Sequence, residues 1–163
     1  MEIRDATKDD SGLVVPLMVE CFNMKTEAEK TFLKELEQHH HYIIAVEVGM
    51  CLGLISWVMH GRPSHGLYEL YHIGIIQDAR GKGVANKLFK AMEEEAAAFF
   101  KSQGFRVRKL FIMTHDDNVR AHRFYEKMGA KKDAVLKSHY YPDKDEVVYS
   151  KFFNEVSTSG SSK

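Results

Sequence analysis

The chain has little proline, little cysteine and no excess of charge of either sign. Its 163 residues include 3 prolines and 2 cysteines, and 23 basic residues offset 23 acidic ones. The missing basic excess argues against a nucleic-acid partner, because such proteins neutralise phosphates with Lys and Arg. Cys21 and Cys51 lie in apolar contexts, which favours buried thiols in a reducing cytosol and leaves a disulfide open as the alternative.

Long apolar runs are also missing. No stretch is long enough to span a bilayer, and the charged start from Met1 to Asp5 is unlike a signal peptide. We therefore expect a cytoplasmic protein without a membrane partner. The length and the hydrophobic content of 44% are typical of one domain with a full core. We place this single domain at residues 1–153 and interpret residues 154–163 as a disordered tail.

What the chain does contain is an alternation of strand and helix patterns. Thr26 and Glu29 have the form of a capping box, so a helix is expected to begin at Thr26. The run His39–His41 is interpreted as the exposed end of this helix rather than as a metal site, because adjacent helical residues do not face one another. Residues 140–145 are predicted to form a loop. Strands are predicted at 2–5, 42–48, 51–60, 70–76, 109–114, 133–138 and 146–153, and further helices at 10–22, 85–103 and 118–128.

The most informative segment is 77–85, which connects an apolar strand to an amphipathic helix and contains Gly81 and Gly83. Glycines allow a tight turn and a close approach of the main chain. The helix start presents free N–H groups and the positive end of the helix dipole. Arg80 and Lys82 add positive charge. The segment therefore predicts a binding site for a ligand that carries a pyrophosphate.

Two common phosphate loops do not fit this segment. In the Walker loop Gly-Lys is followed by Ser or Thr, whereas Gly83 stands here. The dinucleotide fingerprint needs a third glycine where Asn86 stands, and an acidic residue about 20 positions further on, where the helix is still ending. Taken alone, the segment is also compatible with an ordinary tight turn.

A second motif lies at residues 118–130. It follows the pattern Asn-x-x-Ala-x-x-Phe/Leu-Tyr-x-x-x-Gly-Phe, with Ala130 in place of the final aromatic residue. The glycine segment, about 35 residues earlier, follows the pattern Gln/Arg-x-x-Gly-x-Gly/Ala, with Asp78 at its first position. Together the two motifs resemble the GNAT family of N-acetyltransferases, whose glycine loop binds acetyl-CoA. The resemblance covers most of residues 1–153.

This resemblance implies an α/β fold, the GNAT fold, with about seven strands in a twisted, mixed and mostly antiparallel sheet and about four helices. It implies that strands four and five splay apart to hold acetyl-CoA, with Gly74 permitting a bulge just before the residues that pair with pantetheine. The pyrophosphate would lie on the loop amides, and Asn118 would hydrogen-bond the pantetheine arm. No metal is implied. The residues expected to bind acetyl-CoA are Ile75, Ile76, Arg80, Gly81, Lys82, Gly83, Val84, Ala85, Asn118 and Tyr125.

The resemblance also implies catalytic roles. Tyr125 would protonate the departing CoA thiolate or hydrogen-bond its sulfur, because a phenol is protonated at neutral pH. The attacking amine must lose a proton, since an alkylamine has a pKa of about 10. Glu69 is the candidate base, with a solvated glutamate at a strand end as the alternative. His72 titrates in a suitable range, but a histidine beside Tyr71 in a strand is more often a packed, hydrogen-bonded group.

The acceptor amine is less defined by the sequence. The layout is similar to that of acetyltransferases acting on protein N-termini, but Met113 stands where those enzymes commonly carry a glutamate. A small-molecule amine and a peptide N-terminus both remain candidate acceptors, and both a monomer and a homodimer are compatible with the chain. The predicted function is acetyl transfer from acetyl-CoA to a primary amine by direct attack. The alternative is a CoA-binding sensor or interaction module without turnover, which would have no need of Tyr125.

Overall fold

The computed structural model describes residues 1–153, so the tail expected at 154–163 lies outside the described residues. One seven-stranded sheet has the order β1-β2-β3-β4-β5-β7-β6, and the β4–β5 pair alone is parallel. The predicted fold class, a mixed and mostly antiparallel sheet with four helices, is confirmed. The strands are β1 (Glu2–Asp5), β2 (His41–Glu47), β3 (Met50–His60), β4 (Leu67–Ile75), β5 (Lys109–His115), β6 (Lys131–Tyr141) and β7 (Lys144–Phe152), and the helices are α1 (Ser11–Phe22), α2 (Ala28–Glu37), α3 (Val84–Ser102) and α4 (Val119–Lys127).

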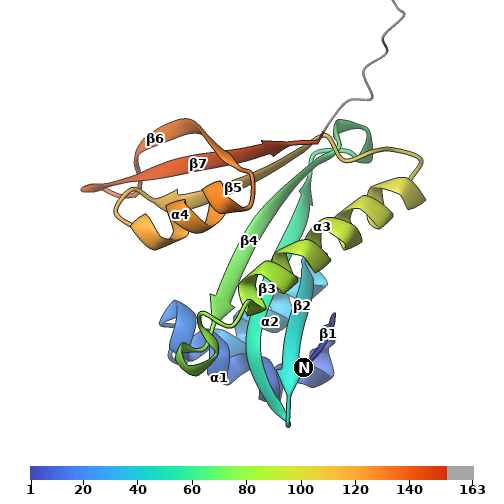
Figure 1. Ribbon diagram of the computed structural model, residues 1–163, viewed down its shortest axis with the longest axis vertical. Helices are drawn as coiled ribbons and strands as arrows, with labels where there is room; N and C mark the ends of the chain where they lie inside the picture. The colour runs from blue at the N-terminus through green and yellow to red at the C-terminus, as the bar shows by residue number, and fades with distance from the viewer. Residues whose placement is uncertain (154–163) are drawn as a thin grey trace, which may run out of the picture.

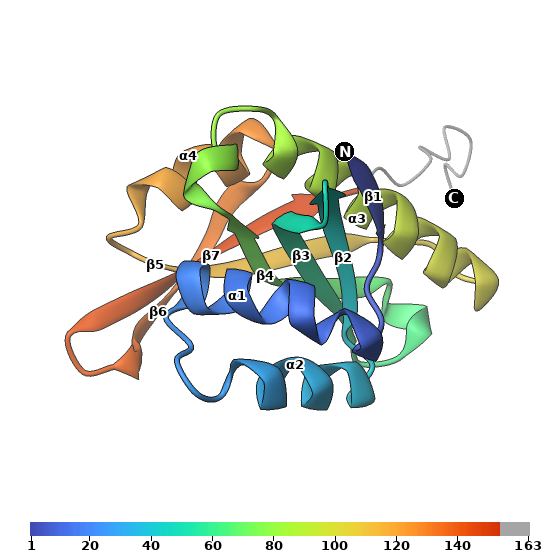
Figure 2. The ribbon, with the colours of Figure 1, turned by 90° about the horizontal axis from the view of Figure 1, so that it is seen from below.

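Helices cover both faces of the sheet. Figure 2 shows α1 and α2 against one face and α3 and α4 against the other. The alternation along β2 explains this arrangement, because successive side chains of a strand point to opposite faces. Ile43 and Ala45 belong to the core beneath α3, whereas Tyr42 and Ile44 belong to the core beneath α1 and α2.

β4 and β5 pair over a short stretch and then separate. Leu67–Leu70 pairs with Lys109–Ile112, and beyond these residues the two strands share no ladder. β5 continues to pair with β7 up to His115, while β4 stays with β3. Figure 1 shows the resulting divergence of β4 and β5 from a common end. The sheet thus contains a gap in its middle, which matches the predicted splay of strands four and five.

The bulge that accompanies this separation is not where the sequence placed it. Ser56 pairs with His72 and Trp57 with Leu70, so Tyr71 is the extra residue on β4. Gly74 has a different use, because a Cβ atom there would lie 2.9 Å from Cβ of Cys21. The glycine lets α1 pack closely against β4, and the expectation of a bulge just before Ile75 is corrected.

Three local predictions also need correction. The second helix begins at Ala28 rather than Thr26, and its N-cap residue Glu27 makes no side-chain capping bond. The histidine run does not form the exposed end of a helix, because His41 is the first residue of β2 and stacks on Trp57 at 4.0 Å between ring centroids. The loop expected at 140–145 is a tight turn, with its flanking residues in β6 and β7.

Both cysteines are free thiols, with Cys51 buried and Cys21 half-buried. In residues 1–153, no group of three or more His, Cys, Asp or Glu side chains is arranged to hold a metal ion. Within the same residues, no helix is long and apolar enough to cross a membrane.

An ion pair holds the short 3-10 turn Lys8–Asp10 that leads into α1. Arg4 donates to both carboxylate oxygens of Asp10 at 2.9 and 2.7 Å, and the Thr7 N–H donates to the same carboxylate at 2.8 Å. The hydrogen bonds from Arg4 lower the pKa of Asp10 to about 2. Because this value lies below the ordinary pKa of 3.8, the charged carboxylate stabilises the fold above pH 4, and this contribution is lost as the pH falls toward 2.

Asp10→Asn is expected to lower the free energy of unfolding by about 1–3 kcal/mol at pH 7, because it breaks a partly buried charged pair. Urea unfolding at pH 7 and at pH 2.5 measures the effect, and the difference from the parent should shrink at the lower pH. The exposed neighbour Asp9 provides the control Asp9→Asn, which should change stability little at either pH. An equal loss at both pH values would contradict the assigned role of the charge.

Candidate active site

The glycine segment turns directly into α3. Gly81 and Gly83 have φ angles of 73° and 79°, which L residues with side chains rarely adopt. Gly83 is the N-cap of α3 and provides no side chain to satisfy the first helical amides. The helix start therefore keeps donors and positive potential available for an anion, as predicted for this turn.

A cavity of about 220 Å³ lies against this helix start. It is lined by the loop from Gly81 to Ala85, apart from Lys82, and by three basic side chains, Arg80, Arg120 and Lys127. Three cations beside free helical amides favour phosphate groups. Lys82 lies elsewhere, because it lines a separate pocket with Glu47 and Asp78.

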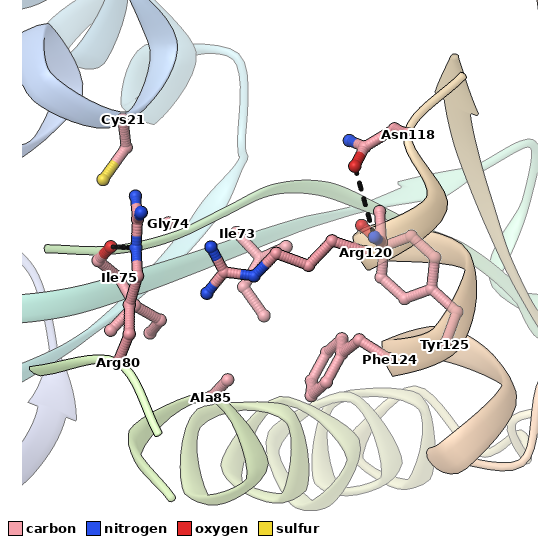
Figure 3. Close-up of a pocket in the computed structure, with 11 residues that line it drawn as sticks. Cys21, Ile73, Gly74, Ile75, Arg80, Ala85, Asn118, Arg120, Phe124 and Tyr125 are labelled. Carbon is pink, nitrogen blue, oxygen red and sulfur yellow. Dashed lines mark hydrogen bonds between the residues drawn. The ribbon is translucent and has the colours of Figure 1, made fainter. Parts of the chain in front are cut away.

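An adjoining cavity of about 310 Å³ extends from the loop along β4 toward α4. Figure 3 shows Ile73, Gly74 and Ile75 on one side of it, Ala85 on α3, and Asn118, Phe124 and Tyr125 on the α4 side. Ile76 is not part of this lining. Its N–H donates to the Leu52 carbonyl at 3.0 Å, and its side chain packs against both cores.

Two arginines point into this cavity (Figure 3). Arg80 Nε donates to the Ile75 carbonyl at 3.0 Å, so the last carbonyl of β4 already has a partner. Arg120, on the first turn of α4, reaches across the cavity and lines both cavities. Sequence analysis did not single out Arg120; its place two residues after Asn118 was the available signal.

Asn118 and Tyr125 bring the second motif to the same cavity. Asn118 caps α4, with Oδ1 accepting from the Ala121 N–H at 3.2 Å. Tyr125 is 5% exposed, and burial raises the pKa of its phenol well above the ordinary value of 10. The phenol therefore stays protonated at neutral pH and is available as a donor.

A third cavity, of about 680 Å³, lies beside the same gap and is lined mainly by residues of β4, β5, β6 and β7. Glu69 lies in it, 5% exposed, with an oxygen 2.6 Å from Nε2 of His60. Burial raises the pKa of Glu69 in spite of this contact. The solvated strand-end glutamate considered from the sequence is therefore not what the structure shows.

Glu146 lines the same cavity. It belongs to β7, is 2% exposed and contacts Nδ1 of His115. His72 behaves as predicted, packed and with Nε2 3.2 Å from Glu35. Burial opposes the charge on Glu35, but the hydrogen bonds with His72 and Tyr42 leave its pKa lowered overall.

The fold and the cavities define a protein with cation-lined cavities beside a pair of splayed strands. The chain matches the model of the acetyltransferase (GNAT) family over residues 10–130, which is more than half its length. It therefore belongs to the GNAT family of acetyltransferases, and the family and enzyme class predicted from the two motifs are confirmed.

Individual relatives are distant. The chain is 28% identical over 106 residues to YycN, an uncharacterized N-acetyltransferase of Bacillus subtilis; the match covers 63% of this chain and 64%, just under two thirds, of YycN. An aminoglycoside 6′-N-acetyltransferase solved with coenzyme A superposes with a TM-score of 0.77 at 15% identity, covering 95% of this chain and 98% of that one. The ribosomal-protein-S18-alanine N-acetyltransferase of Escherichia coli gives 0.76 at 16% identity, covering 97% of each chain. These two structures establish the shared fold.

Arg120→Ala is expected to weaken CoA binding about five- to tenfold, because it removes one of the cations that line the cavity at the start of α3. Calorimetric titration with CoA measures the change. Titration with pantetheine, which lacks the phosphates, should show a smaller effect. Arg123→Ala, an exposed arginine on the same helix outside both cavities, is the control. Equal weakening for CoA and pantetheine would contradict a phosphate contact.

Proposed function

We propose that the protein transfers an acetyl group from acetyl-CoA to a primary amine by direct attack within a ternary complex. The observation that carries the proposal is the pair of separate cavities that border one gap in the sheet. Ile73 lines the donor side and its neighbour His72 lines the other side, so one strand separates the two compartments. A donor and an acceptor bound there would meet between β4 and β5.

The cavities of about 220 and 310 Å³, here called the donor cavities, fit the chemistry of acetyl-CoA. Arg80, Arg120 and the amides of Gly81, Gly83, Val84 and Ala85 would bind the pyrophosphate. The edge of β4 at Ile75 and the side chain of Asn118 would hydrogen-bond the pantetheine arm. Ile76 and Lys82, expected from the sequence, are left out of this contact set because they lie outside both cavities.

Acetyl-CoA supplies an activated thioester, so the main task of the protein is to orient the amine. Glu69 accepts the amine proton, directly or through a water molecule. The amine nitrogen forms a bond to the acetyl carbon as the carbon–sulfur bond breaks. Tyr125 donates its phenolic proton to the departing sulfur. The products are the acetylated amine and CoA.

The acceptor is a small-molecule amine or a peptide N-terminus. Neighbours of the same fold include an aminoglycoside acetyltransferase and an acetyltransferase of a ribosomal-protein alanine. The third cavity, which contains Glu69 and is here called the acceptor cavity, supports a small-molecule amine as the acceptor. Its volume of about 680 Å³ is within the range of small-ligand pockets.

Tyr125→Phe is expected to lower kcat about 10²-fold or more, with the affinity for acetyl-CoA changed only a few-fold, because only the proton donor is removed. Thiol release under saturating acetyl-CoA measures kcat. Tyr149→Phe is the matched control, because its ring lies 6.0 Å from Tyr125 while its hydroxyl bonds Glu126 outside the cavity. Unchanged turnover in Tyr125→Phe would remove the phenol from the acid role, and CoA binding without turnover by the parent would favour the sensor alternative.

Glu69→Gln tests the base. Because burial raises the pKa of Glu69 above its ordinary 4.5, activity of the parent should fall as the pH drops toward this raised pKa and the carboxylate becomes protonated. The variant should lose most of kcat/KM at neutral pH and should lack this acidic limb. Glu37→Gln, an exposed change at the end of α2, should retain the parent profile. An acidic limb identical in parent and Glu69→Gln would exclude Glu69 as the base.

A further inference from the structure

The acceptor cavity has an unusual balance of charge. Its lining contains two carboxylates, Glu69 and Glu146, and no Lys or Arg. Three tyrosines, Tyr71, Tyr140 and Tyr141, supply aromatic faces at its rim, each about half exposed. A buried carboxylate is costly without a compensating partner, and aromatic faces attract cations. This lining favours a positively charged organic ligand.

The contacts of the carboxylates leave one oxygen of Glu146 for such a ligand. Oε1 of Glu146 is buried against Nδ1 of His115, and among the hydrogen bonds of residues 1–153 none is made by its other oxygen, Oε2. Glu69 has one partner, His60. The pKa of the Tyr140 hydroxyl is raised, first by burial and then by the negative charges of Glu69 and Glu146. The negative potential of both side chains therefore reaches the same rim.

The two carboxylates occupy different ends of the cavity. Glu69 pairs across the sheet with Phe111, whereas Glu146 pairs with His115, four residues further along β5. At about 3.3 Å per residue, these positions lie roughly 13 Å apart along the strand. The two glutamates therefore enter the cavity from well-separated backbone positions, so two charged groups of one ligand can each face a carboxylate.

We propose that the acceptor is an aliphatic diamine or polyamine, an inference that rests on the function proposed above. The reacting amine lies at the gap on the Glu69 side. A second, protonated amine binds Glu146, against the ring of Tyr141, which lies 5.7 Å from the ring of His115. Glu146 is then a specificity-determining residue and takes no part in the proton transfer.

Acceptors matched in length test this proposal. Thiol release is measured with 1,4-diaminobutane and n-butylamine, then with spermidine and a short peptide with a free N-terminus. The diamine should exceed the monoamine in kcat/KM by about tenfold or more, mainly through a lower KM, as one charged hydrogen bond provides. Equal kcat/KM for the matched pair, or a preference for the peptide, would overturn the proposal.

Glu146→Gln should reduce the diamine-to-monoamine ratio of kcat/KM about tenfold by raising the KM for the diamine. Asp143→Asn, an exposed change in the adjacent β6–β7 turn, should keep the parent ratio. A parent ratio retained in a folded Glu146→Gln would overturn the role of Glu146. Thiol release with equal kcat/KM for the monoamine and the diamine would contradict this inference and leave the proposed function standing. No thiol release with any amine, while CoA still binds, would contradict the proposed function.

Discussion

The short parallel pairing of β4 with β5 is the constraint on which the rest of the site depends. Two features keep the strands apart beyond Leu70: the extra residue Tyr71 redirects β4, and Gly74 lets α1 pack closely against it. β5 meanwhile remains hydrogen-bonded to β7. The β4 edge that faces the gap therefore lacks a strand partner over residues 71–75, although Arg80 bonds its last carbonyl. An unpaired edge inside a sheet is costly, and an extended ligand with amide groups can satisfy it.

The gap also separates charges that cancel in the sequence. The net charge of the chain is zero, but the charges are unevenly distributed around the gap. The cavity at the start of α3 is lined by Arg80, Arg120 and Lys127, whereas the acceptor cavity is lined by two carboxylates and no Lys or Arg. Each side is complementary to one of the two proposed substrates, an anionic coenzyme and a cationic amine. Each of the two proposed substrates would then be attracted by its own set of charged side chains.

The parts of this arrangement that depend on local sequence could be predicted, and those that depend on long-range pairing could not. The turn at Gly81 and Gly83 needs positive φ angles and a helix that follows directly. Both are determined by residues close together in the sequence. The position of the bulge depends on how β3 pairs with β4, some fifteen residues apart in the chain. Glu146 is the first residue of a strand predicted at 146–153, but its burial follows from the pairing of β7 with β5. His41 likewise owes its place to Trp57, on another strand.

The Arg80 hydrogen bond would link the two halves of the proposed donor site. Its Nε donates to the Ile75 carbonyl, which is the β4 group proposed to pair with pantetheine, while the residue also borders the phosphate cavity. A guanidinium bonds a phosphate more strongly than a neutral carbonyl. A ligand with both a pyrophosphate and an amide-bearing arm can therefore draw Arg80 to the phosphate and replace it at the carbonyl. A ligand with a pyrophosphate but no amide arm would draw Arg80 away and leave the Ile75 carbonyl without a donor. A ligand with the arm but no pyrophosphate would displace Arg80 from this carbonyl without offering it a phosphate. The Arg80–Ile75 bond would therefore favour the whole coenzyme over either fragment.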